Sequence, residues 1–138
     1  MQSLSPEQYG RLRQFADAWT RRHLKSAKRD PHFNPRLGVD ALCFQPVDNQ
    51  LLGALITPLS LSLAMLPQDS AALVPDNGAT RHVALPSGGY DFVAERLEVG
   101  IWWWRCQVLD DLSDIESLQQ ASRLAQQLME RVMTPDDG

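Results

Sequence analysis

The stretch Ile101-Trp-Trp-Trp-Arg-Cys-Gln-Val108 contains three consecutive tryptophans and decides how the fold is interpreted. As a β-strand, it presents alternate side chains to opposite faces of a sheet. One face is wholly apolar and consists of Trp102, Trp104, Cys106 and Val108. The other consists of Ile101, Trp103, Arg105 and Gln107. We expect the wholly apolar face to pack against helices, while the second face either binds a partner or is covered by a loop or a second copy.

Other stretches also have the composition of strands, and turn residues separate them. The expected strands are 41–44, 51–57, 81–85, 90–97 and 100–109. The expected turns are Pro46-Val-Asp-Asn-Gln50, Gly88-Gly89 and Glu98-Val-Gly100, and a surface loop is expected over 68–79. The stretch 59–66 alternates leucine with serine, which favours a strand, but Pro58 could equally open a short helix.

A helix is predicted at each end of this strand region. Ser5-Pro6-Glu7-Gln8 has the pattern of a capping box, and this helix should end near Lys28 because Pro31 follows. The second helix should begin at another capping box, Ser113-Asp-Ile-Glu116, and end before Pro135. The expected buried stripe of the first helix is Tyr9, Leu12, Phe15, Ala16, Trp19 and His23. That of the second is Ile115, Leu118, Ala121, Ala125, Leu128 and Val132.

The predicted order of elements defines the fold class. An antiparallel sheet of five or six strands, flanked by an N-terminal and a C-terminal helix, is an α+β fold. We expect both helices on one face of the sheet. The length of 138 residues favours one domain over 1–138.

Composition excludes several classes of protein. The chain is 43% hydrophobic and 22% charged, which is typical of a folded domain and not of a disordered one. No apolar run is long enough to span a membrane, and the N-terminus has no apolar core of a secretory signal. We therefore expect a cytoplasmic protein without stable membrane association.

Charge is unevenly distributed along the chain. Residues 1–36 hold eight Lys/Arg against three Asp/Glu, and 37–138 hold five against fourteen. A solvated basic face on the first helix is the simpler interpretation, and a nucleic-acid or lipid surface is the alternative. Because the rest of the chain is acidic and would repel a polyanion, we expect no nucleic-acid partner.

Signals for catalysis and for metal binding are weak. The sequence has no nucleophile elbow, no phosphate-binding loop and no dinucleotide-binding glycine pattern. His23, His32 and His82 lack the spacing of metal ligands, and Cys43 and Cys106 are expected as small core residues in apolar strands. The acids at 110–116 fit a helix N-terminus. We expect no enzyme, no cofactor and no metal, although a small-ligand or catalytic domain remains the alternative.

Several stretches together resemble one protein family. They are Asn34-Pro-Arg-Leu-Gly-Val-Asp-Ala-Leu-Cys-Phe44, Leu52-Gly-Ala-Leu-Ile-Thr-Pro58, Leu66-Pro67, Leu85-Pro-Ser-Gly88 and Tyr90-Asp-Phe92, with Cys106 before the last helix. In this order they resemble the HybE/HupJ family of NiFe-hydrogenase assembly chaperones over roughly 29–133. The sequence departs from the family pattern at Leu59, where the family has tryptophan, and at Asp110-Asp111, where it has Ser-Pro. The two cysteines are too few for the rubredoxin module that is fused to some members.

The resemblance implies a non-enzymatic accessory protein that holds a hydrogenase subunit precursor, chiefly the small subunit with its twin-arginine leader, until cofactors are inserted. We expect the partner to bind beside the last strand, with Trp103 as the apolar anchor. The other residues expected at this surface are Ile101, Arg105, Leu59, Asp91, Asp110 and Asp111. Acidic side chains would attract the arginines of a leader. Whether the protein forms a homodimer stays open.

Overall fold

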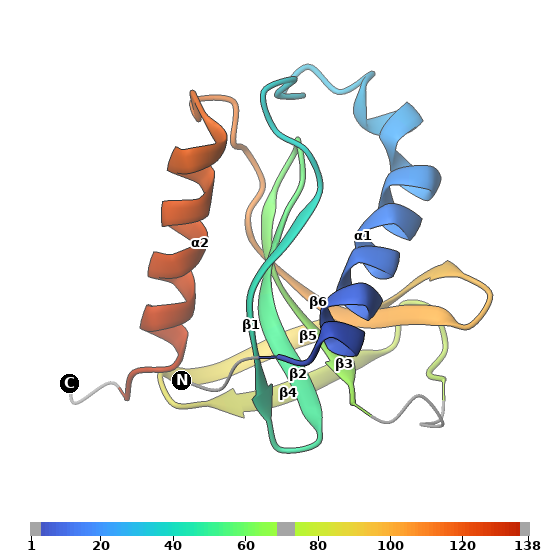
Figure 1. Cartoon of the computed structure of the whole chain (residues 1–138), viewed down its shortest axis with the longest axis vertical. Coiled ribbons are helices and arrows are strands. Elements are labelled where there is room, and N and C mark those ends of the chain that lie inside the picture. The colour runs from blue at the N-terminus through green and yellow to red at the C-terminus, as the bar shows by residue number, and fades with distance from the viewer. Residues whose placement is uncertain (1–3, 69–73, 136–138) are drawn as a thin grey trace.

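The computed structural model describes residues 4–68 and 74–135 and consists of one sheet with a helix at each end of the chain. Residues 69–73, part of the expected loop over 68–79, lie outside the described residues. The elements, shown in Figure 1, are α1 (Pro6–Ala27), β1 (Asp40–Val47), β2 (Gln50–Ile56), β3 (Leu61–Pro67), β4 (Thr80–Leu85), β5 (Gly88–Glu98), β6 (Ile101–Leu109) and α2 (Leu118–Val132). The α+β prediction is confirmed.

The six strands form one antiparallel sheet in the order β1-β2-β3-β6-β5-β4. The stretch 59–66, whose sequence fits either a strand or a short helix, contains most of the strand β3, which pairs with β2 and β6. The turn between β5 and β6 is Val99-Gly100, as expected, and Gly100 has a φ of 77°. The turn between β4 and β5 is instead Pro86-Ser87, because Gly88 already pairs with Leu85.

Helix α1 begins as its sequence predicts. The Ser5 hydroxyl accepts the Gln8 N–H at 3.1 Å, and the Gln8 side chain accepts the Ser5 N–H at 2.8 Å. These bonds satisfy two backbone donors that a helix start otherwise leaves free. The buried face of α1 includes Phe15 and Trp19, whereas Tyr9 is exposed and was wrongly expected in the stripe.

The prediction that both helices share one face of the sheet is wrong. Figure 1 shows α1 and α2 on opposite sides of the strands. The core is correspondingly divided in two. The strand residues that pack with α1 are Leu51, Leu55, Ala64, Leu66 and Trp103. Those that pack with α2 are Leu52, Ala54, Ile56, Leu63, Trp102 and Trp104. All of β3 and nearly all of β2 is buried, so both faces of these strands need a cover.

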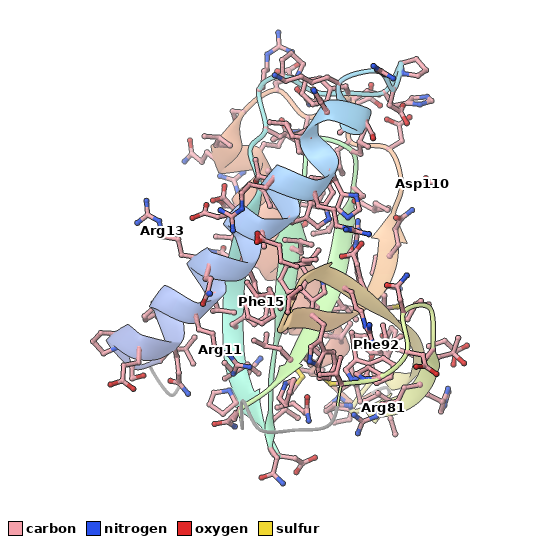
Figure 2. The ribbon with its side chains drawn as sticks, turned by 90° about the vertical axis from the view of Figure 1, so that its right-hand side faces the viewer. Arg11, Arg13, Phe15, Arg81, Phe92 and Asp110 are labelled. Atoms are coloured by element: carbon pink, nitrogen blue, oxygen red, sulfur yellow. The ribbon has the colours of Figure 1, made fainter. Side chains whose placement is uncertain are left out.

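Trp103 is therefore not an exposed anchor. It is 0% exposed and lies under α1, with its ring centroid 5.6 Å from that of Phe15. Phe15 points inward from α1 in Figure 2, whereas Arg13 points away from the molecule. The expected alternation in β6 is correct, but each face of the strand meets a different helix.

Helix α2 begins later than predicted. Its N-cap is Ser117, whose hydroxyl accepts the Gln120 N–H at 3.1 Å, and the expected start at Ser113-Asp-Ile-Glu116 is wrong. Ala121, Ala125 and Val132 are buried as expected. Leu118, the first helical residue, is 54% exposed, in contrast to the prediction.

Cys43 is exposed, so the expectation of a core residue is wrong for this cysteine. It has a φ of 60° and lies where the register between β1 and β2 shifts. The next residue, Phe44, packs over Gly53, where an added Cβ would lie 2.2 Å from the phenyl ring. The bulge thus places Phe44 in the core and turns Cys43 outward. Cys106 is half-buried against the α2-side core.

Asn34 holds three segments together at the end of the molecule near the C-terminus of α1. It is 2% exposed, and its amide nitrogen donates to the carbonyl oxygens of Leu112 at 2.9 Å and Ile115 at 2.8 Å. Its side-chain oxygen accepts the Arg36 N–H, and its own N–H donates to the Pro58 carbonyl. We call this set of contacts the Asn34 clasp.

Replacing Trp103 with alanine should lower the free energy of unfolding by about 3–5 kcal/mol, because the change leaves a cavity under α1. Tyr9→Ala, at a residue that is 57% exposed, is the control and should change it by less than about 0.5 kcal/mol. Urea denaturation followed by far-UV circular dichroism measures both. Equal stability of the two variants would contradict the burial of Trp103.

Replacing Asn34 with aspartate keeps the shape of the side chain but removes both donated hydrogen bonds. The Ile115 carbonyl loses its side-chain donor, the Leu112 carbonyl keeps only the Ile115 N–H, and a carboxylate now faces both, so the free energy of unfolding should fall by roughly 2–4 kcal/mol. The exposed Gln126→Glu makes the same chemical change on α2 and should have little effect. A wild-type denaturation midpoint for Asn34→Asp would show that the clasp contributes nothing.

Candidate functional site

A groove runs along β6 on the face of the sheet that α1 covers. It consists of two adjoining hollows of about 470 Å³ and about 410 Å³. Both hollows are lined by His23, Arg105 and Gln107, so they adjoin at these three residues. We call them together the α1–β6 groove. Its first part, the Asp110 end, is bordered by Leu59 and Asp110, and its second part, the Arg96 end, by residues of β5.

Arg105 forms the floor where the two hollows meet. Its guanidinium donates to the hydroxyls of Ser62 at 3.0 Å and Ser60 at 2.8 Å, and to Glu95 Oε2 at 3.0 Å. The guanidinium carbon lies 5.9 Å from the ring centroid of Trp19, a cation–π distance. These contacts fix the side chain, which is only 16% exposed, and neutralise its charge. Arg105 is thus a rigid part of the groove.

Glu95 links the floor to the buried tryptophan. One carboxylate oxygen accepts the Trp103 indole N–H at 2.8 Å, and the other accepts from Arg105. His23 Nε2 lies 3.7 Å from Glu95 Oε2. Burial lowers the pKa of His23 despite the opposing effect of Glu95, with Arg105 adding to the lowering. This lowering favours the neutral form of His23, and Arg105 pairs with Glu95, so the charges in the middle of the groove largely compensate one another.

Trp19 and His23 form the helix side of the groove and have unused hydrogen-bonding capacity. Their ring centroids are 4.9 Å apart. Trp19 is 3% exposed, and neither its Nε1 nor His23 Nε2 has a hydrogen-bond partner in the described part of the chain. Buried polar atoms are normally satisfied, so this wall could accept a polar occupant.

Carboxylates gather around the Asp110 end. Asp30 and Asp110 line it. Asp111 follows Asp110, accepts the Ser113 N–H at 2.9 Å and lies 3.6 Å from His32 Nε2. The hydrogen bonds from Ser113 lower the pKa of Asp111, which favours its ionised form. Figure 2 shows Asp110 at the side of the molecule.

The structure separates the residues that we expected at one partner surface. Leu59, Arg105 and Asp110 lie together in the groove, with Asp111 beside it. Ile101 lines a different hollow near Arg11, and Trp103 is buried under α1. Asp91 lies at the β4–β5 edge, with Oδ1 2.7 Å from His82 Nδ1.

Sequence reasoning missed much of the groove. The missed lining residues are Trp19, His23, Asp30, Arg22, Glu95 and Arg96. The spacing of Trp19, His23, Ser26 and Asp30 by four, three and four residues could have indicated one helix face that turns polar towards its end. Nothing local could have connected this face with β5 and β6.

Two features are absent from residues 4–68 and 74–135. This part of the chain contains no group of three or more His, Cys, Asp or Glu side chains arranged to hold a metal ion. None of its helices combines the length and apolar character needed to cross a membrane.

Comparison with known proteins gives consistent results. Residues 11–137 match the family model described as NiFe-hydrogenase assembly, chaperone, HybE. The chain is 31% identical over 108 residues to the "Probable rubredoxin HupJ" of Rhodobacter capsulatus, which covers 75% of this chain and 38% of that protein. It is 27% identical over 114 residues to the "Hydrogenase expression/formation protein HupJ" of Bradyrhizobium diazoefficiens, with coverages of 81% and 66%. The chain thus spans less than two thirds of the length of these relatives.

A solved structure has the same fold. The solution structure of HybE from Escherichia coli matches with a TM-score of 0.70 at 20% identity, over 90% of this chain and 85% of that one. The expected family is confirmed by the family model, which spans the whole sheet, all of α2 and most of α1. The chain belongs to the HybE family of NiFe-hydrogenase assembly chaperones.

Proposed function

We propose that this protein is a non-catalytic chaperone that holds the precursor of a NiFe-hydrogenase small subunit, with its twin-arginine leader, before cofactor insertion and export. In this proposal residues 1–138 act as one cytoplasmic domain, and the α1–β6 groove binds the leader. Family membership supports the role in hydrogenase assembly. The choice of the small subunit and its leader comes from the resemblance to the family, and the charge of the groove supports it.

The carboxylates at the Asp110 end are the observation that carries the proposal. Asp30 and Asp110 line a hollow that also contains the partly buried Leu59. Arginine side chains would pair with the carboxylates, and Leu59 would contact the apolar residues of the leader. Leu59 takes the place of the Trp103 anchor in this proposal, because α1 covers Trp103.

Contacts within the fold support the proposal over nucleic-acid binding by α1. Arg21 pairs with Glu98, and Arg11 donates to the Pro67 carbonyl. These two cations of the helix are thus partly engaged by the protein itself. We propose that no nucleic acid and no stable membrane contact is part of the function.

The leader should account for most of the affinity. Titration calorimetry with the small-subunit precursor, and with the same subunit lacking its leader, tests this directly. Removing the leader should weaken binding by at least about tenfold, which corresponds to about 1.4 kcal/mol. Equal affinity for both forms would overturn the assignment of the leader, and binding to the large subunit alone would overturn the choice of subunit.

Asp110→Asn should weaken precursor binding by about two- to fivefold at low salt, because an exposed carboxylate contributes modestly to an ion pair. The effect should shrink as salt screens the charge. Asp114→Asn is the matched control: it removes the same charge from an exposed residue that does not line the groove. If both variants weaken binding equally, the effect is one of net charge and the groove is not the site.

A further inference from the structure

The two ends of the α1–β6 groove carry opposite charge. Asp30 and Asp110 line one end, and Arg22 and Arg96 line the other. Lys28 and Arg29 are close to Asp30 in sequence but do not line the groove. Among the described residues, neither Arg22 nor Arg96 takes part in an ion pair, although one Arg96 nitrogen donates to the Pro75 carbonyl at 3.1 Å.

The neutral floor leaves these two ends as the main sources of field in the groove. Arg105 is compensated by Glu95, and burial disfavours the charged form of His23. An elongated ligand with a charge at each end therefore meets attraction in one orientation. In the opposite orientation it meets like charges at both ends, which is unfavourable.

The groove is suited to a ligand that is recognised through side chains and not through strand addition. β6 is paired on both sides, with β3 and with β5, so its backbone has no open edge. Val93 at the Arg96 end is 44% exposed and offers an apolar contact. At the other end, Trp19 lines the hollow, and its buried Nε1 has no hydrogen-bond partner among the described residues.

We propose that the α1–β6 groove binds an extended peptide segment in one direction, with its cationic end at Asp30 and Asp110 and a carboxylate-bearing end at Arg22 and Arg96. The identity of this segment as a hydrogenase leader rests on the proposed function, but its polarity rests on the groove alone. For a leader, the arginine pair lies at the Asp110 end. The residues that follow pass over Arg105 towards β5, and a client with an acidic residue beyond its apolar stretch binds more tightly.

Two synthetic peptides of identical composition test the polarity. The first has two arginines at its amino end, a neutral centre and two glutamates at its carboxyl end, and the second carries the same four charged residues alternating in its centre between neutral ends. Both are acetylated and amidated so that the termini carry no charge. Fluorescence anisotropy at low salt should show the first peptide binding about tenfold more tightly. Equal affinities would overturn the proposal.

Charge variants show whether the two ends of the groove cause the preference. Arg22→Gln and Asp110→Asn should each reduce the ratio of the two affinities, whereas Arg123→Gln and Asp114→Asn, the same changes at exposed residues outside the groove, should not. The double exchange Arg22→Asp with Asp110→Arg leaves one residue of each sign at each end and should abolish the preference. An unchanged ratio in this double variant would assign the preference to another surface.

A spin label reports the direction of binding without relying on affinity. A nitroxide at the arginine end of the first peptide should broaden the amide resonances of Leu59 and Ser60 more than those of Gly78 and Ala94, and a label at the glutamate end should do the opposite. The reverse pattern would overturn the proposed direction. If neither peptide binds, the polarity proposal is wrong, whereas the comparison of precursors with and without a leader decides the proposed function separately.

Discussion

The burial of β2 and β3 on both faces is the constraint on which the rest of the structure depends. Their leucines point alternately to each side, and nearly every residue of the pair is inaccessible to water. An antiparallel sheet commonly leaves one face in water, but this pair cannot, because apolar area on either face would remain exposed. One helix is therefore required on each side. The two helices at opposite ends of the chain meet this requirement.

The position of α1 determines the chemistry of the groove. Once α1 covers Trp103, the indole N–H can no longer reach water and needs an acceptor within the protein, which Glu95 supplies. The half-buried carboxylate in turn pairs with a cation, Arg105, which also bonds to Ser60 and Ser62. The burial of Trp103 in the core thus determines, through the bonds of Glu95 and Arg105, which side chains form the floor of the groove. The result is a groove with a fixed, neutral floor between two charged ends.

The sequence predicts local structure here better than it predicts packing. The capping box at Ser5, the class of the fold and the alternation along β6 follow from neighbouring residues, and the structure agrees. Ser113 and Ser117 both precede a glutamate or glutamine by three residues, so local pattern alone cannot choose between them. The Asn34 clasp, which holds the Leu112 and Ile115 carbonyls, accompanies the later helix start. The burial of Trp103 and most of the lining of the groove could not be predicted, because they depend on contacts between distant segments.

The Asn34 clasp also has a consequence for the order in which the protein folds. Its two donated hydrogen bonds connect residues 78 and 81 positions apart in the chain. During synthesis from the N-terminus, α1 and the hairpin of β1 and β2 emerge long before these acceptors exist. The Asp110 end of the groove is therefore completed only when the ribosome has released the chain beyond Ile115. The client site proposed at this end can therefore form only after Ile115 has left the ribosome.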